Sequence, residues 1–203
     1  MTDTSRAERF SLHRRDVAQQ IADAGGGDLL VVTGLGSTNW DFTAAGDRDL
    51  IFPLWGAMGG AVPLALGLAL AQPDRRVLCA TGDADMLMSL GSLATVAVQA
   101  PQNLSVAVFD NERYGETGMQ ATATAHQADI AGIAAASGIP VTATVREQAE
   151  LDAAIPEMLE GAGPSVFVIK VRAEPLPFVL PPKDGAYLKD RFRKALLGDA
   201  GIV

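Results

Sequence analysis

The sequence predicts an α/β fold in which a doubly wound, mostly parallel sheet carries helices on both faces. Five short, continuous apolar runs are suited to strands that are covered on both sides; they span residues 29–33, 77–80, 104–109, 141–145 and 165–171. Helical patterns lie between them at 60–71, 87–99, 128–137 and 147–160. Alternating strands and helices are typical of a parallel sheet, and right-handed crossovers place helices on both of its faces.

The two ends of the chain carry their own patterns. Residues 5–24 form a polar, amphipathic helical pattern that Gly25-Gly26-Gly27 ends. Four prolines within 174–183 predict an extended arm, which leads to a helix at 187–197. A chain of 203 residues is long enough for one α/β core and short for two. We therefore expect one domain over 1–203, with an N-terminal helix at 5–24 and a C-terminal arm plus helix over 174–203.

Composition and charge exclude several classes of protein. Apolar residues make up 48% and charged residues 20%, which is an ordinary profile for a folded chain. A formal net charge of -8 argues against nucleic acid as a partner, because phosphate backbones are bound by clustered Lys and Arg. The single Cys79 lies in an apolar run and is expected to be a small buried hydrophobe in a reducing compartment.

The sequence gives no sign of secretion or of a membrane span. The first residues lack the apolar segment of a signal peptide, so we expect a cytoplasmic protein. The uncharged stretch 50–73 is long enough to cross a bilayer. Three prolines and four glycines break it into a loop and a helix, which argues against a membrane location.

Oxygen-bearing side chains follow two of the predicted strands. Thr81-Gly82-Asp83-Ala84-Asp85 comes after one strand, and Asp110-Asn111 ends the next. In parallel sheets ligands bind at the carboxyl ends of the strands. A magnesium ion needs few protein oxygens when phosphate and water complete its octahedron, so Asp83, Asn111 and the carbonyl of Arg113 are candidate ligands. The alternative is that Asp83 caps a helix and that Asp110-Asn111 is a simple turn.

These segments resemble the motifs of thiamine diphosphate (ThDP) enzymes. Gly82-Asp83, followed 28 residues after Asp83 by Asn111, is similar to the family's diphosphate and metal motif. Trp55-Gly56-Ala57-Met58-Gly59 resembles the segment that holds the aminopyrimidine. Tyr114 to Gln120 and Asp190 to Arg193 look like the β subunits of sulfopyruvate decarboxylase and the related phosphonopyruvate decarboxylases. The resemblance covers most of residues 25–195.

The resemblance implies a cofactor site and its metal. The cofactors would be ThDP and Mg²⁺, with Asp83, Asn111 and the Arg113 carbonyl on the metal. Small residues beside Asp83 would admit the diphosphate, and a helix starting near Leu87 would point its positive end at it. The Gly56 carbonyl would accept from the 4′-amino group and Met58 would support the bent cofactor. The full cofactor-binding set is Gly36, Ser37, Thr38, Gly56, Met58, Gly82, Asp83, Ala84, Asp85, Asn111, Tyr114 and Gly115.

The resemblance also implies a missing half. In the family a glutamate that activates the pyrimidine comes from a separate pyrimidine-binding domain, and 203 residues leave no room for it. The catalytic residues therefore stay unknown on this chain, and the activating glutamate is expected on a partner. The implied protein is the cofactor-binding subunit of a hetero-oligomeric decarboxylase that acts on a small 2-oxo acid.

Two departures from the family pattern leave the metal and the substrate open. Ala84 replaces the second glycine of the motif, which is costly only if its φ is positive. The loop 33–40 lacks the Thr-Ser-Arg-Glu run of the phosphonate and sulfonate enzymes. Trp40 and Phe42 offer an apolar face for a different substrate, and Asp41 would repel a dianionic tail if it faced the pocket. The missing cation would then come from Arg113 or Arg48.

Three other functions compete with a decarboxylase subunit. The same cofactor chemistry supports an acetolactate synthase-like carboligase, and Ala84 keeps a non-catalytic scaffold of the same fold open. A nicotinamide-binding Rossmann domain is raised by Gly34-Leu35-Gly36 after a strand, but Asn39 replaces the third glycine and no helix is expected to open there. A serine hydrolase has little support, because Ser37 and Ser89 have no evident base.

The two histidines offer no base for such chemistry. His13 is expected to be solvated on the N-terminal helix. His126 is expected either at the pocket mouth or facing solvent in a loop.

Overall fold

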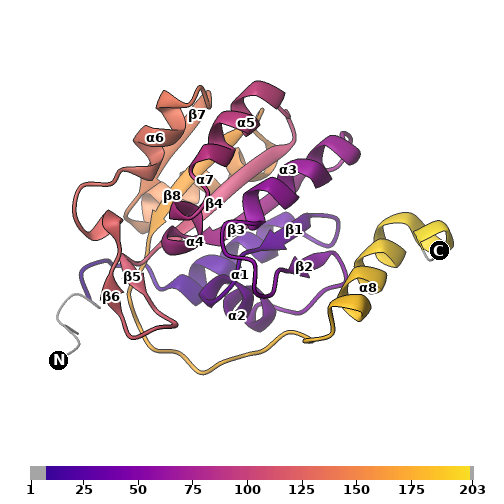
Figure 1. Cartoon of the computed structure of the whole chain (residues 1–203), viewed down its shortest axis with the longest axis horizontal. Coiled ribbons are helices and arrows are strands. Elements are labelled where there is room, and N and C mark those ends of the chain that lie inside the picture. Colours follow the sequence, from indigo (N-terminus) through magenta and orange to yellow (C-terminus); the bar gives the residue numbers. More distant parts are fainter. Residues whose placement is uncertain (1–7, 202–203) are drawn as a thin grey trace.

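A six-stranded parallel sheet forms the centre of the computed structural model, which describes residues 8–201 (Figure 1). The strand order is β2-β1-β3-β4-β8-β7, which confirms the predicted fold class. The strands are β1 (Leu30–Thr33), β2 (Ile51–Pro53), β3 (Val77–Gly82), β4 (Leu104–Asp110), β7 (Val141–Val145) and β8 (Ser165–Lys170).

The five predicted strands are present with ends shifted by two residues at most. Four of them are buried along nearly their whole length, whereas β7, at the edge of the sheet, is mostly half-buried. The sixth strand, β2, was not predicted. It has three residues, and Thr33 of β1 pairs with its Pro53. Pro53 lies on the edge strand, where the missing backbone N–H leaves no ladder partner unsatisfied.

Two hydrophobic cores lie on opposite faces of the sheet, and alternate strand residues point into each. Val77 and Cys79 of β3 face the core built with α3 (Ala61–Ala71), α5 (Gly91–Gln99) and α6 (Ile130–Ala136). Leu78 and Ala80 face the core built with α1 (Arg14–Gly25), α2 (Ser37–Ala44) and α7 (Gln148–Glu160). Cys79 is fully buried, as expected, and burial raises the pKa of its thiol.

The N-terminal helix is shorter than predicted. Helix α1 begins at Arg14 and not at residue 5, so the prediction is wrong for residues 8–13, and residues 5–7 lie outside the described part of the chain. Leu12 instead pairs with Val171, and the Arg172 N–H donates to the Leu12 carbonyl at 2.9 Å. This contact with a segment distant in sequence holds residue 12 extended, which helical periodicity cannot reveal.

The helix predicted at 87–99 is two helices. Helix α4 (Asp83–Leu87) starts directly after β3, and α5 starts at Gly91. Between them the Ser92 hydroxyl donates to the Ser89 carbonyl at 2.6 Å, a local bond of the kind that competes with a continuous helix. The helix next to the predicted metal ligand therefore begins at Asp83 itself and not near Leu87.

Helix α2 was also not expected. It opens at Ser37 after Gly36, whose φ is +96°, so the expectation that no helix opens beside Asn39 was wrong. Asn39 is buried, with its side-chain amide donating to the Leu54 carbonyl at 3.1 Å. The Thr33 hydroxyl donates to the side-chain oxygen Oδ1 of Asn39. These bonds hold α2 against the carboxyl end of β1.

The remaining elements lie at the rim of the sheet. A small antiparallel hairpin, β5 (Arg113–Tyr114) and β6 (Gln120–Ala121), leads to the 3₁₀ turn η2 (Ala123–Ala125). The uncharged stretch 50–73 divides into β2, a loop and α3. The loop and the helix were predicted from its prolines and glycines, and the strand was not. Within residues 8–201, no helix combines the length and the apolar character that crossing a membrane requires.

An extended arm over residues 172–184 leads to helix α8 (Gly185–Leu197), and the 3₁₀ turn η3 (Gly198–Gly201) follows (Figure 1). Both the arm and the helix were predicted. Arg191 forms a two-pronged ion pair with Asp47 at 2.7 and 3.0 Å. Phe192 packs edge-on against Phe52 of β2, with ring centroids 5.8 Å apart. These contacts dock α8 beside the edge strand.

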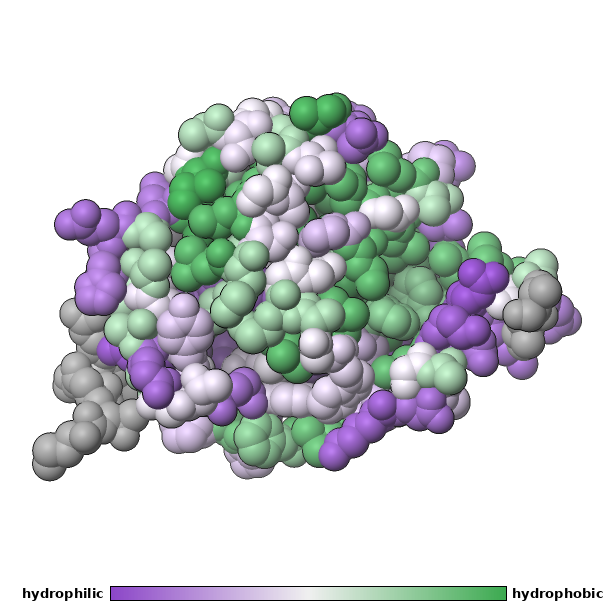
Figure 2. Space-filling model, in the orientation of Figure 1, coloured by the Kyte–Doolittle hydropathy of each residue, from purple (hydrophilic) through white to green (hydrophobic). Residues whose placement is uncertain are grey.

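The helices on the two faces differ in charge. Helices α3, α5 and α6 contain no charged residue, whereas α1 and α7 on the other face are rich in them. Helix α8 is also charged, although its Phe192 packs on the same core as α3. Figure 2 shows hydrophobic residues gathered over α3, α5 and α6, with hydrophilic residues at the margins and over α8. Val98 of α5 and Leu70 of α3 are among the exposed apolar side chains. Such an uncharged surface is typical of a protein contact.

We predict that Phe192→Ala lowers the free energy of unfolding by about 3 kcal/mol, because the ring is buried against Phe52. Urea unfolding measures this change. Tyr187→Ala on the same helix is the control, since its ring is about half exposed and its loss is expected to cost less than about 1 kcal/mol. Equal costs for the two variants would contradict the docking described for α8.

Candidate cofactor site

A cavity of about 600 Å³ opens at the carboxyl ends of β1, β3, β4 and β8. This is the edge of the sheet at which the sequence predicted the chemistry. Its walls come from the loop and first turn of α2, the start of α4, the segment after β4, and single residues of α1 and of the arm. The lining residues are Arg14, Leu35, Gly36, Ser37, Thr38, Met58, Gly82, Asp83, Ala84, Asp85, Met88, Phe109, Asn111, Arg113, Tyr114, Gly115, Glu116, Thr117, Gln120 and Val171.

All but one of the residues predicted to bind cofactor or metal lie on this cavity. The exception is Gly56, which is exposed and is not part of the wall. Its φ of +70° lies in the left-handed region, which glycine adopts without strain in tight turns. Met58, two residues on, does line the cavity and remains 43% exposed at its mouth.

Asp83 is buried at the first turn of α4, where its carboxylate is held by two hydroxyls. Thr122 and Thr124 both donate to Oδ2, at 2.6 and 3.1 Å. Burial, together with the nearby negative charge of Asp110, raises the pKa of Asp83 to about 7. Within the described residues no side chain bonds Oδ1. The carboxylate is therefore fixed on one side and available on the other.

A second acidic group lies behind Asp83. Asp110 accepts from Thr124 at 2.8 Å and from Lys170 at 2.6 Å. Lys170 also reaches Glu112 at 3.2 Å, and Arg9 meets the other oxygen of Glu112 at 2.7 Å. Sequence reasoning missed this network. Lys170 ends β8 directly opposite Asp110 in the parallel register, so only the strand pairing could have revealed it.

Asn111 and Arg113 form a turn that faces the cavity. The Asn111 Oδ1 accepts from the Arg113 N–H at 2.8 Å, so the turn role weighed from the sequence is present. One lone pair of that oxygen remains for another partner. The Arg113 guanidinium is buried, and its hydrogen bond within the described residues goes to the Glu112 carbonyl at 2.8 Å.

Ala84 fits the position of the motif's second glycine. It lies within α4 and is not among the described residues with positive φ. A Cβ at this position is therefore free of the backbone strain that the substitution raised as a concern. The argument from Ala84 against metal binding does not hold.

Asp85 fixes the shape of the cavity by joining two loops. Its Oδ2 accepts from the Thr81 hydroxyl at 2.5 Å, and its Oδ1 accepts from the Gly59 N–H. Gly34 passes directly over this carboxylate, and a Cβ there would overlap it. Asp85, for which only a cofactor contact was predicted, thus joins the segment that carries Met58 to the end of β3.

The loop residues expected to shape the substrate pocket point elsewhere. Phe42 is fully buried against Phe109, and Trp40 is buried outside the cavity wall, so the apolar face predicted from them is wrong. Asp41 is also fully buried and pairs with Arg14 and Arg15, so it does not face the pocket.

The cavity has other charged side chains than those expected. Arg48 donates to the Gly26 carbonyl and does not line the wall, whereas Arg113 does. Sequence reasoning missed Arg14 and Glu116, which both line the cavity, and Glu116 accepts from the Trp40 ring N–H at 3.1 Å. His13 pairs with Glu174 and is half exposed, and His126 is exposed and off the wall.

The donors around the cavity fit a magnesium diphosphate. Asp83 offers one carboxylate oxygen, Asn111 one amide oxygen and Arg113 one carbonyl, which matches the hard-oxygen preference of Mg²⁺. Ser37 Oγ and Asn111 Nδ2 lie 3.9 and 4.0 Å from where a Cβ on Gly115 would be, so the backbone is open at this point. No group of three or more His, Cys, Asp or Glu side chains within residues 8–201 could hold a metal alone.

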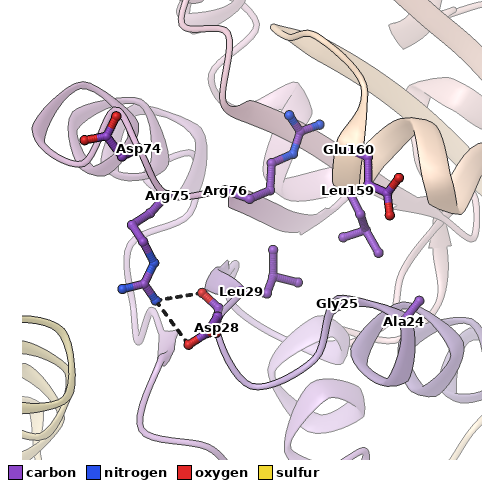
Figure 3. A pocket seen from close by; sticks show the side chains of 9 residues that line it. All are labelled: Ala24, Gly25, Asp28, Leu29, Asp74, Arg75, Arg76, Leu159 and Glu160. Carbon is purple, nitrogen blue, oxygen red and sulfur yellow. Dashed lines mark hydrogen bonds and ion pairs between the residues drawn. The ribbon is translucent and has the colours of Figure 1, made fainter.

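A second cavity of about 480 Å³ lies at the amino ends of the strands (Figure 3). Arg75 there pairs with Asp28, and its guanidinium donates to the Asp28 carbonyl at 2.8 Å. Arg76 donates to the Gly161 carbonyl at 2.8 Å and to the Ser105 hydroxyl at 2.6 Å. These bonds join α7 to the sheet, which is a structural role.

Comparison with known proteins identifies the family. Residues 36–169 match the family model described as thiamine pyrophosphate enzyme, C-terminal TPP binding domain. The chain belongs to this family. The matched segment contains Asp83 and Asn111 of the cavity. The family match therefore rules out the alternative of a nicotinamide-binding domain, which Gly34-Leu35-Gly36 had suggested.

Individual relatives sharpen the comparison. A phosphonopyruvate decarboxylase of Streptomyces viridochromogenes is 37% identical over 145 residues, or 71% of this chain and 36% of the relative. The sulfopyruvate decarboxylase subunit beta of Methanocaldococcus jannaschii is 34% identical over 131 residues, or 64% of this chain and 69% of the relative. The resemblance predicted from the sequence is confirmed. The chain spans about a third of the length of the phosphonopyruvate decarboxylase.

The fold has a solved counterpart. Benzoylformate decarboxylase from Polynucleobacter necessarius superposes with a TM-score of 0.72 at 23% identity, over 82% of this chain and 34% of that one. At this identity the likeness concerns the fold, and it agrees with the parallel sheet and its two helical layers.

We predict that Gly34→Ala lowers the free energy of unfolding by about 2 kcal/mol and displaces the segment around Met58, because the new Cβ overlaps the Asp85 carboxylate. Urea unfolding and the NMR shift of the Gly59 amide measure the two effects. Gly27→Ala is the control, since nothing lies within 4 Å of a Cβ there. An unchanged Gly59 amide shift in Gly34→Ala would refute the link.

Proposed function

We propose that the chain is the ThDP- and Mg²⁺-binding subunit of a 2-oxo acid decarboxylase of the sulfopyruvate and phosphonopyruvate type. The observation that carries the proposal is the cavity at the carboxyl edge of the sheet, where Asp83 and Asn111 meet. Membership of the thiamine pyrophosphate enzymes supports ThDP as the ligand. The two most informative relatives are decarboxylases of these substrates by name.

The residues of this chain would hold and orient the cofactor. Asp83, with Oδ2 fixed by two threonines, would offer Oδ1 to the metal together with Asn111 and the Arg113 carbonyl. Met58, on the loop tied down by Asp85, would support the cofactor's bend. When bound, ThDP supplies a nucleophilic carbon and an electron sink for loss of CO₂. The chain thus contributes positioning and charge.

The active site is proposed to be completed by a pyrimidine-binding partner subunit. The β-subunit name of the Methanocaldococcus jannaschii relative supports this division. Met58 and Met88, which line the cavity, are 43% and 59% exposed, so the mouth is an apolar rim. An exposed apolar rim around a ligand site is typical of a surface that a second chain covers. The activating glutamate is expected on that chain.

The positions of three loop residues support a dianionic substrate. Asp41, which would repel a sulfonate or phosphonate, is paired with two arginines behind the wall. Trp40 and Phe42 do not offer the apolar face that favoured an aromatic substrate. Arg113 remains as a cation on the wall that an anionic tail can meet. We therefore favour sulfopyruvate or phosphonopyruvate over uncharged 2-oxo acids.

Two alternatives stay within the same cofactor family. A carboligase of the acetolactate synthase type would use the same site and differ in the second carbonyl compound that it accepts. A non-catalytic scaffold was raised by Ala84, whose helical backbone conformation removes that argument. Measuring acetolactate beside CO₂ release separates a carboligase from a decarboxylase. Measuring ThDP binding tests the non-catalytic scaffold.

We predict that Asp83→Asn weakens ThDP binding in the presence of Mg²⁺ by at least about 100-fold, because a metal ligand contributes more than the outer groups whose loss costs 10–100-fold. Isothermal calorimetry on the chain with its partner measures this change. Asp74→Asn, the same chemical change at an exposed distant site, is the control. An affinity that neither Asp83→Asn nor EDTA alters would exclude the metal assignment.

We also predict that the purified chain alone releases no CO₂ and that the reconstituted complex does. Rates on sulfopyruvate, phosphonopyruvate, pyruvate and phenylpyruvate define the substrate, with acetolactate measured in parallel. A preference for phenylpyruvate over both dianions by more than about tenfold, or about 1.4 kcal/mol, would contradict the assignment. Robust decarboxylation by the isolated chain would contradict the need for a partner.

A further inference from the structure

We propose that Arg14, at the start of α1, binds the phosphate oxygens of the cofactor's diphosphate. The inference rests on the proposed function and deepens it, because it adds to the metal a cation that belongs to the chain itself. Helix α1 lies outside the segment that matches the family model, which begins at residue 36. Nothing in the sequence pattern of that helix marks Arg14 as different from the arginine that follows it.

Arg14 extends its side chain from the start of α1 to the wall of the cavity. Its side chain is 6% exposed, yet it is part of the cavity wall, so the little surface it retains faces the site. Its Nη1 donates to Asp41 Oδ2 at 2.5 Å and approaches the Ser37 carbonyl at 3.5 Å. Ser37 is one of the residues predicted to bind the cofactor. The guanidinium has five N–H donors, and these two contacts engage one nitrogen.

The position next to Ser37 lies close to Asn111, the predicted metal ligand. Ser37 Oγ and Asn111 Nδ2 both lie about 4 Å from where a Cβ on Gly115 would stand, so the start of α2 and the segment after β4 converge there. Asn111 is the candidate metal ligand at this convergence. Arg14 therefore lies against the same part of the cavity as the metal site, on the side of α2.

Two cations share the carboxylate of Asp41. Arg14 and Arg15 both pair with it, and the side chain of Arg14 is 6% exposed whereas that of Arg15 is 25% exposed, so water solvates Arg15 far better than Arg14. Because Arg14 shares its only acidic partner within residues 8–201 with a second arginine, a further anion beside this buried cation is favourable. Mg²⁺ bound to one carboxylate has a net charge of +1, which does not neutralise the negative charge of a diphosphate. Arg14 would supply a further positive charge, and its planar guanidinium suits phosphate oxygens.

Arg15 provides a matched control. It contacts the same Asp41 at 3.2 Å and donates to the Pro177 carbonyl at 3.0 Å, but it does not line the cavity. A merely structural role of the Arg–Asp cluster would make Arg14 and Arg15 similar in their effect on ligands. A phosphate-binding role concerns Arg14 alone.

The experiment titrates the chain, with its partner subunit present, with inorganic pyrophosphate and then with ThDP, both with Mg²⁺, by isothermal calorimetry. Arg14→Gln is expected to raise the Kd of both ligands at least about tenfold, while Arg15→Gln changes them less than about twofold. The single variant Arg14→Gln removes one of the two cations that pair with the buried Asp41. The double variant Arg14→Gln/Asp41→Asn removes that carboxylate as well, and it is expected to show the same loss of affinity for both ligands. Urea unfolding confirms that each variant is folded.

Several outcomes overturn the proposal. Wild-type affinity for pyrophosphate in the folded double variant does so, and so does an equal loss in Arg15→Gln. Phosphonoacetate, an unreactive dianion, is titrated into the ThDP-loaded chain as a stand-in for the substrate tail. If Arg14→Gln weakens phosphonoacetate and leaves pyrophosphate unchanged, Arg14 serves the substrate and the diphosphate assignment is wrong.

The same titrations separate this proposal from the proposed function. If the wild-type chain binds ThDP and the Arg14 variants bind it equally well, only the present inference fails. If pyrophosphate binding depends on Arg14 but ThDP binds no better than pyrophosphate, the phosphate site stands and the ThDP function is in question. A wild-type chain that binds neither ligand overturns both.

Discussion

The carboxylate of Asp85 joins three segments that are far apart in the sequence. It accepts from Thr81 at the end of β3 and from the Gly59 amide, and it occupies the space that a side chain on Gly34 would need. The end of β1, the end of β3 and the loop with Met58 therefore keep fixed relative positions. A buried carboxylate that two donors satisfy is a rigid connection, because leaving either donor unpaired costs free energy. The shape of the cavity depends on it.

Around this frame, the charged groups are arranged in pairs behind the wall. Asp110 and Glu112 are matched by Lys170 and Arg9, and they lie behind the threonines that hold Asp83. The Thr124 hydroxyl lies within hydrogen-bond distance of both acidic groups, and its single proton can go to either of them. This arrangement keeps Asp83 in a buried, negatively charged setting, which raises the pKa of its carboxyl. A divalent cation is the natural partner for such a group.

The two helical layers differ in what they can meet. Charged helices α1 and α7 face one side, while α3, α5 and α6 present an uncharged surface on the other (Figure 2). The sequence contained this asymmetry as long uncharged stretches, one of which had the length of a membrane span. Only the fold showed that these stretches share one face, because strands placed between them bring separate helices together.

The sequence by itself determined the parallel α/β class, five of the six strands and the edge that carries the site, because buried strands must be apolar and their ends must meet. It also indicated the family, through the spacing of Asp83 and Asn111 together with the segments 55–59 and 114–120, and the family match confirms this. Tertiary structure decided where α1 begins, that α2 exists, and which loop residues face the cavity. Those outcomes depend on partners distant in sequence, such as Val171 for Leu12 and Asp41 for Arg14, and local periodicity does not encode such partners.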